Sequence, residues 1–139
     1  MHYLLDTNIL SYFLQGQTSI VTRIRDAGGL SFLSISTITV AESMHGVIAM
    51  QDGAKRTRLL ASIEQLLATG IGVRPFSIDA ARVFAEAKAK LEAAGVSVSF
   101  PDLAIASIAM AENKTLVSND GVFEHVARVH YLRFERWEP

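Results

Sequence analysis

Tyr3-Leu4-Leu5-Asp6-Thr7-Asn8-Ile9-Leu10 is the stretch that decides the fold, because it joins a short apolar strand to a helix through an acid. The strand is expected over residues 2–5 and the helix over residues 7–14. Asp6 or Thr7 can cap that helix, since either side-chain oxygen accepts a hydrogen bond from a backbone N–H that the first turn leaves free. In parallel sheets, functional sites form at the carboxyl ends of the strands, which is where Asp6 stands.

The rest of the chain alternates between apolar runs and helical patterns. Further strands are expected over residues 30–35, 71–76, 115–118 and 130–134. Further helices are expected over residues 19–27, 37–50, 54–68, 77–95, 101–113 and 122–126. Strands separated by helices predict an α/β fold with a mainly parallel sheet. A chain of 139 residues suits one domain, residues 1–139, with a single sizeable core.

Four acids lie directly against apolar runs. They are Asp6, Glu42, Asp102 and Asp120. A buried carboxylate without a partner is unfavourable or shifts its pKa, and a divalent cation is the simplest way to keep several carboxylates ionised together. Their places relative to the predicted strands allow all four to meet at one edge of the sheet. The sequence therefore predicts a shared metal site at that edge.

Each acid also has a simpler explanation when it is taken alone. Asp6 and Asp120 can cap helices, and Asp102 can interact with a helix dipole from the first turn. Glu42 has no such role, because it is expected within a helix on the same face as Ile38 and His45. An all-oxygen set favours Mg²⁺, with Mn²⁺ as the alternative, over zinc. Such ions activate water for displacement at phosphorus, so a phosphodiester is the expected substrate class.

Composition excludes several other classes of protein. The chain has no cysteine, which removes disulfides, thiolate zinc sites and cysteine nucleophiles. Its net charge is −1, so any phosphate-binding surface must be local, and Lys55, Arg56 and Arg58 are its densest candidate unless they form only a solvated helix face. No apolar run approaches the roughly eighteen residues of a membrane span, and the start does not resemble a signal peptide. We therefore expect a cytoplasmic protein with no membrane partner.

Other catalytic motifs are not supported by the sequence. Glu42 and His45 have a Glu-x-x-His di-iron spacing, but that site needs a second such helix in a bundle, and the chain has none. There is no G-x-S-x-G element of a serine hydrolase and no P-loop or Rossmann glycine pattern.

Four blocks of the chain, in order, resemble those of PIN domains, and specifically of the VapC toxins of bacterial VapBC toxin–antitoxin pairs. The first block is residues 3–10, the second is 34–42, the third is 102–106, and the fourth is 115–120 with Phe123 after it. The resemblance covers essentially the whole length. Two positions depart from the family pattern: Pro101 replaces a commonly polar residue, and Ser118 replaces the usual Thr.

The resemblance implies a PIN-like three-layer α/β/α fold and a magnesium-dependent endoribonuclease that cuts RNA such as tRNA or rRNA. Asp6, Glu42, Asp102 and Asp120 would bind the metal. Hydrogen-bonding support would come from Thr7, Asn8 and Ser118. The family also implies a homodimer that a small VapB-type antitoxin inhibits.

Two rival functions remain open at this point. A phosphohydrolase of the haloacid-dehalogenase type also opens with an apolar strand and an acid, but it needs a second acid where this chain has Asn8. The other rival is a non-catalytic PIN-like module that binds RNA, and the presence of all four acids argues against a loss of activity.

Overall fold

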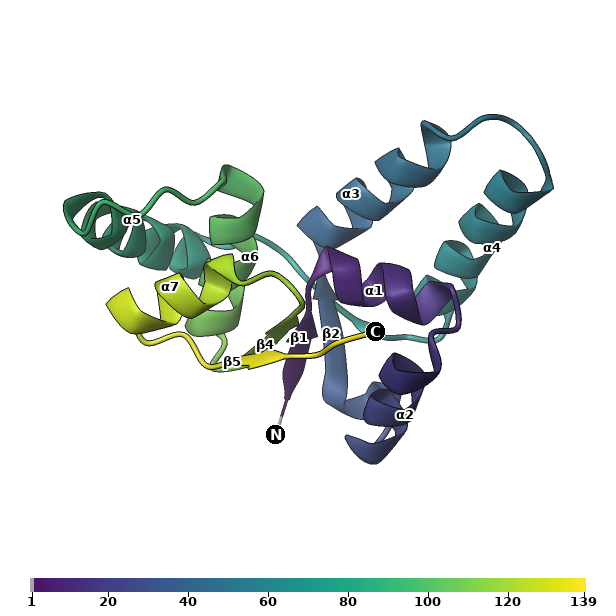
Figure 1. Cartoon of the computed structure of the whole chain (residues 1–139), viewed down its shortest axis with the longest axis horizontal. Helices are drawn as coiled ribbons and strands as arrows, with labels where there is room; N and C mark the ends of the chain where they lie inside the picture. The colour runs from purple at the N-terminus through teal and green to yellow at the C-terminus, as the bar shows by residue number, and fades with distance from the viewer. Residues whose placement is uncertain (1) are drawn as a thin grey trace.

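A central sheet of five strands organises the computed structural model, which describes residues 2–139 (Figure 1). The strands are β1 (Tyr3–Leu5), β2 (Leu33–Ser36), β3 (Gly72–Arg74), β4 (Thr115–Ser118) and β5 (Phe134–Arg136). Their order across the sheet is β3-β2-β1-β4-β5, and every neighbouring pair is parallel. The predicted mainly parallel sheet is therefore confirmed. Because all strands point the same way, their carboxyl ends lie along a single edge.

Helices cover both faces of this sheet. They are α1 (Thr7–Leu14), α2 (Thr18–Asp26), α3 (Thr37–Ile48), α4 (Ala54–Ala68), α5 (Ile78–Ala93), α6 (Phe100–Ala111) and α7 (Val122–Val129). In Figure 1, α5, α6 and α7 gather on one side of the sheet and α1 and α2 on the other. Helices α3 and α4 pack side by side as a two-helix arm that projects from the body. The expected three-layer α/β/α arrangement is confirmed.

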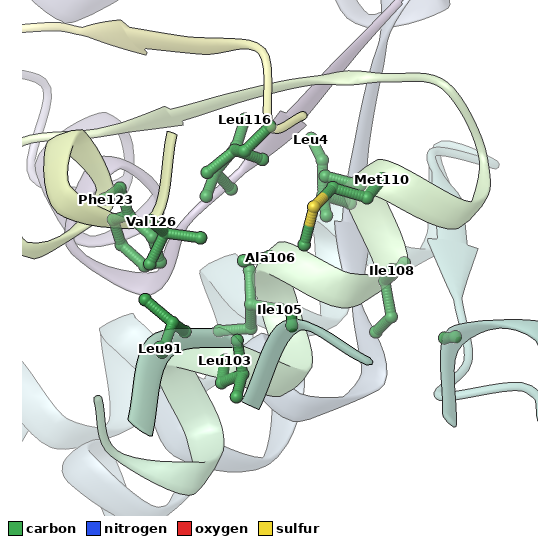
Figure 2. Packing of buried hydrophobic residues seen from close by; sticks show 14 residues of the cluster. Leu4, Leu91, Leu103, Ile105, Ala106, Ile108, Met110, Leu116, Phe123 and Val126 are labelled. Atoms are coloured by element: carbon green, nitrogen blue, oxygen red, sulfur yellow. The ribbon is translucent and has the colours of Figure 1, made fainter. Parts of the chain in front are cut away.

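The alternation of side chains along β1 separates two apolar cores. Leu4 packs into the core under α5, α6 and α7, together with Leu116 and Phe123 (Figure 2). Leu5 points to the opposite face and packs with Val117 beneath α1 and α2. Successive strand residues point to opposite faces, so two adjacent leucines contribute to both cores. Helix α6 is the most buried helix, since every residue from Leu103 to Met110 is buried.

Side-chain caps fix where the helices at the carboxyl edge begin. Asp6 caps α1, Ser36 caps α3, and Ser77 caps α5 as predicted. Ser99 caps α6 with Pro101 in the first turn, so this helix begins one residue earlier than expected. A side-chain oxygen before a helix accepts a bond from a backbone N–H that the helix cannot satisfy internally.

Four of the five predicted strands have different bounds in the structure. Strand β1 begins at Tyr3 rather than at residue 2, and β3 covers Gly72–Arg74 rather than residues 71–76. The differences at β2 and β5 are larger. Residues 30–32 form a 3₁₀ turn, η1 (Leu30–Phe32), and only the following residues form β2. The last strand was expected over residues 130–134, but β5 begins at Phe134. Helix α7 continues to Val129, and residues 130–133 carry the chain back to the sheet, where Phe134 pairs with Leu116. No helix within residues 2–139 combines the length and apolar character needed to cross a membrane.

Two isoleucines on neighbouring helices test the position of the core. Ile105 is fully buried in α6, whereas Ile78 at the start of α5 is 68% exposed. We expect Ile105→Ala to lower the free energy of unfolding by about 2–5 kcal/mol, because it leaves a cavity. Ile78→Ala is the matched control and should change it by less than about 1 kcal/mol. Urea unfolding measures both, and equal losses would contradict the assigned packing.

Candidate active site

Asp6 is the buried acid at the centre of the carboxyl edge. Its backbone N–H donates to the carbonyl of Val117 (2.8 Å), which fixes it where β1 ends beside β4. The side chain is only 5% exposed. Oδ1 accepts from the Thr7 N–H (2.8 Å), and Oδ2 accepts from the Ser118 hydroxyl (2.7 Å). Both carboxylate oxygens of Asp6 are therefore held by neighbouring strand and helix ends.

Ser118 connects Asp6 with the loop that carries Asp120. Its Oγ accepts from Asn8 Nδ2 (3.2 Å) and from the backbone N–H of Asp120 (3.0 Å), while it donates to Asp6. The amide oxygen of Asn8 also accepts from the Asn119 N–H (3.2 Å). These bonds join the end of β1 to the end of β4: Ser118 bonds directly to Asp6 and Asp120, whereas Asn8 bonds to Ser118 and to the Asn119 N–H.

Asp120 is exposed and follows β4 at the start of α7. Its Oδ1 accepts from the Val122 N–H (3.0 Å) at the first residue of α7, although the residue in the cap position of this helix is Gly121 rather than the predicted Asp120. Its second carboxylate oxygen has no hydrogen-bond partner within residues 2–139.

Glu42 reaches the site from the arm and is positioned by a threonine. Thr7 Oγ1 donates to Glu42 Oε1 (2.7 Å) and lies 3.1 Å from Thr39 Oγ1. Thr39 was not among the predicted site residues. It is fully buried, and its N–H donates to the Ser36 cap (3.0 Å). The one sequence feature that could have identified Thr39 is its position three residues after Ser36, the serine that caps α3.

The expectation that Glu42 lies on an apolar helix face is wrong. Glu42, Ala41 and His45 are all exposed, and the buried residues of α3 are Thr39 and Val47. Helix α3 belongs to the projecting arm, so only a narrow stripe of it is covered. Glu42 therefore makes its contact at an open surface rather than inside the core.

Asp102 lies in the first turn of α6 and is partly buried. Its backbone N–H donates to the Ser99 hydroxyl (3.3 Å), which belongs to the helix cap. The positive end of a helix dipole favours a carboxylate at this position. Pro101 is accommodated within this first turn, where its missing N–H leaves no helical bond unmade.

The acids influence one another through their charges. Burial is the main cause that raises the pKa of Asp6 to about 6, and the charges of Asp102 and Glu42 raise it further against the hydrogen bonds from Ser118 and Thr7. Burial also raises the pKa of Asp102, to which the charges of Asp120 and Glu42 add. Asp6 and Asp102 are therefore each affected by the charges of two other predicted acids.

These charge interactions do not by themselves form a metal coordination sphere. Within residues 2–139, no three His, Cys, Asp or Glu side chains converge closely enough to hold a metal ion together. Charges act over longer distances than metal–oxygen bonds, and Glu42 and Asp120 are exposed, each with one carboxylate oxygen held by a hydrogen bond and the other without a partner within residues 2–139. The chemistry of the donors fits a divalent cation, because all of them are carboxylates and a positive ion would relieve both burial and mutual repulsion.

Comparison with known proteins decides the family. Residues 3–129 match the PIN domain. The chain belongs to the PIN-domain family. This PIN domain is 30% identical over 139 residues to "Ribonuclease VapC2" of Rickettsia felis, a match that covers 99% of both chains. It is 37% identical over 125 residues to "Plasmid stability protein StbB" of Pseudomonas syringae pv. tomato, covering 87% of this chain and 90% of the relative.

Solved structures agree with this assignment of the PIN domain. It superposes with a TM-score of 0.85 on a chain of the VapBC2 structure from Rickettsia felis, which is bound to a DNA fragment from their promoter. The sequence identity is 28%, and the match covers 99% of this chain and 100% of that chain. Together with the curated relative that spans the full length, this places the PIN domain among the VapC ribonucleases.

The raised pKa of Asp6 has a consequence for stability without metal. Its folded pKa of about 6 exceeds the ordinary 3.8, so the folded state binds the proton more tightly than the unfolded chain. Stability from this group is present below about pH 4 and is lost as the pH rises through about 6. The full loss is at most roughly 3 kcal/mol.

We therefore expect wild type in EDTA to lose more stability than Asp6→Asn between pH 4 and pH 7. Urea unfolding at a series of pH values measures the difference. Asp79→Asn is the control, since the Asp79 side chain is 82% exposed on α5, and it should follow the wild-type profile. Parallel profiles for wild type and Asp6→Asn would show that the Asp6 carboxylate is not strained by burial.

Proposed function

We propose that this chain is the toxin of a VapBC-type pair and cuts RNA with a divalent ion held by Asp6, Glu42, Asp102 and Asp120. Membership of the VapC ribonucleases makes it an endoribonuclease, a hydrolase of phosphodiester bonds. The ion is Mg²⁺, with Mn²⁺ as the alternative. The observation that carries the metal proposal is the buried Asp6 carboxylate, whose pKa rises because of burial and because of neighbouring acids.

The residues around the acids act as fixed supports. Ser118 and the Thr7 N–H hold one oxygen of Asp6 each, so the carboxylate cannot turn. The Thr7 hydroxyl fixes Oε1 of Glu42 and leaves Oε2 without a partner within residues 2–139. Fixed carboxylates need no reorganisation when charge develops in the transition state. An ion bound by them would activate water and neutralise charge at the phosphate.

The proposed partners follow from the relatives. The Rickettsia felis neighbour is a VapBC assembly on promoter DNA. We infer that a VapB-type antitoxin binds this chain, that the chain forms a homodimer, and that it acts in the cytoplasm as one domain, residues 1–139. Its substrate is RNA, with tRNA and rRNA as the classes to test.

The two rival functions lose ground for separate reasons. A haloacid-dehalogenase-type enzyme needs an acid at position 8, but Asn8 bonds to Ser118 and to the Asn119 N–H instead. A non-catalytic PIN-like module does not require a raised pKa at Asp6, because an amide at that position would avoid the cost of burying a carboxylate. The RNA-binding module is therefore the alternative that the mutants below must exclude.

Substitutions of the acids should lower the cleavage rate more than substitution of a supporting residue. Asp6→Asn and Asp102→Asn should each lower RNA cleavage by more than about 100-fold, because loss of a supporting residue already costs about 10–100-fold in a metal site. Thr7→Val should fall within that smaller range, since it frees Glu42. Cleavage of labelled tRNA and rRNA fragments measures the rates, with Asp79→Asn as a control at wild-type rate. Wild-type rates in both acid variants would favour the non-catalytic module.

Metal removal should change both RNA cleavage and the thermal stability of the protein without RNA. EDTA should abolish cleavage, and Mg²⁺ or Mn²⁺ should restore it. In a thermal melt at pH 7.5, Mn²⁺ should raise the Tm of wild type, because a ligand that binds only the folded state stabilises it. Asp6→Asn should lose most of this rise. An equal rise in both proteins would place the ion elsewhere.

A further inference from the structure

A groove lies between α1 and the arm, directly beside the acids. Its volume is about 320 Å³, and its walls include Thr7 of α1, Glu42 of α3 and Lys55 of α4. The first two residues are joined by the 2.7 Å hydrogen bond from the Thr7 hydroxyl to Glu42 Oε1. The groove and the candidate active site therefore share a wall.

The groove combines apolar walls with an unsatisfied polar group. Val47, Leu59 and Ile63 supply apolar surface. Ser43 also lines the groove, one residue after Glu42, and its Oγ is buried without a hydrogen-bond partner within residues 2–139. A buried hydroxyl that lacks a partner is unfavourable in a folded protein, which points to a ligand that supplies one.

Gly46 leaves one wall of the groove open. It lies on α3 between Ser43 and Val47, and no atom stands within 4 Å of the place where its Cβ would be. A larger residue at this position would project into free space. The groove therefore has the walls, the volume and the free polar atom of a small-ligand pocket rather than of an unfilled core.

We propose that this groove binds one unpaired nucleobase of the RNA, next to the bond that is cut. The proposal rests on the proposed ribonuclease function and assigns its base preference. A nucleotide whose phosphate lies at the acids has its base within reach of the groove, because Thr7 and Glu42 border both. A base needs apolar walls for its faces and hydrogen-bonding groups for its edge, and single-stranded bases are read in this way.

Two polar groups supply the edge contacts. The Ser43 hydroxyl can donate or accept, so it offers one hydrogen bond to the edge of the base. The Lys55 ammonium donates only, and it can contact either a base acceptor or the adjoining phosphate. The groove walls that would contact the faces of the base include Val47 and Leu59.

The test fills the groove and removes its polar atom in separate variants. Gly46→Leu blocks the groove, and Ser43→Ala removes the free hydroxyl with little change in volume. Ala61→Leu is the matched control, since Ala61 is exposed on α4, outside the groove, and takes the same side chain. Each protein is assayed in Mn²⁺ on short single-stranded RNAs that differ in one base beside the cut.

We expect wild type and Ala61→Leu to share one base preference. Gly46→Leu should lose that preference and raise KM for the preferred RNA by about tenfold or more, because a base excluded from the groove loses its burial against apolar walls. Ser43→Ala should lower discrimination between bases by about fivefold, the effect of one hydrogen bond. Thermal melts confirm that Gly46→Leu is folded, and Ser43→Ala supplies an independent reading.

The possible failures are distinguishable. If wild type cleaves no RNA, the proposed function itself falls, and this assignment falls with it. If wild type cleaves and both groove variants keep its base preference, only the nucleobase pocket is overturned. The same holds if the variants keep that preference but lose affinity for a co-expressed VapB-type antitoxin, because the groove then holds a protein segment.

Discussion

The hydrogen bond from Ser118 to Asp6 is the interaction on which the site depends. It holds a buried carboxylate between the ends of two central parallel strands, 112 residues apart in the chain. Burial alone would favour a neutral acid, and the bonds from Ser118 and Thr7 oppose that tendency without cancelling it. The fold thus maintains an acid in a position where a nearby positive charge would favour the ionised form.

Local patterns predicted the elements that carry Asp6 and Asp120, because an apolar run followed by an acid marks a strand end in a short window. The bounds of α1, α4 and β4 match the predicted ranges. The bounds of β5 and the surroundings of Glu42 were wrong, because both depend on tertiary packing. Helix periodicity shows which residues share a face of α3, but only the arm's position shows that most of that face is uncovered.

The groove beside Glu42 could not be predicted from sequence for the same reason. Ser43 and Gly46 are unremarkable in a helix, and their meaning comes from α1 and α4 standing opposite them. Short sequence motifs identified the four acids, whereas the groove is evident only from the packing of α1 against the arm. Family membership rests on the PIN-domain match over residues 3–129 and on 30% identity over the full length to a VapC ribonuclease.

Thr7 belongs to both the acid site and the groove beside it. Its Oγ1 fixes Glu42 at the acid cluster while its side chain forms part of the groove wall. A ligand in the groove that shifts Thr7 would also shift the support of Glu42, so occupancy of the groove would change how tightly the acids hold the proposed ion. Thermodynamic linkage requires the reverse effect to be equal. Occupancy of the groove and ion binding at the acids are therefore expected to be coupled, each changing the apparent affinity of the other.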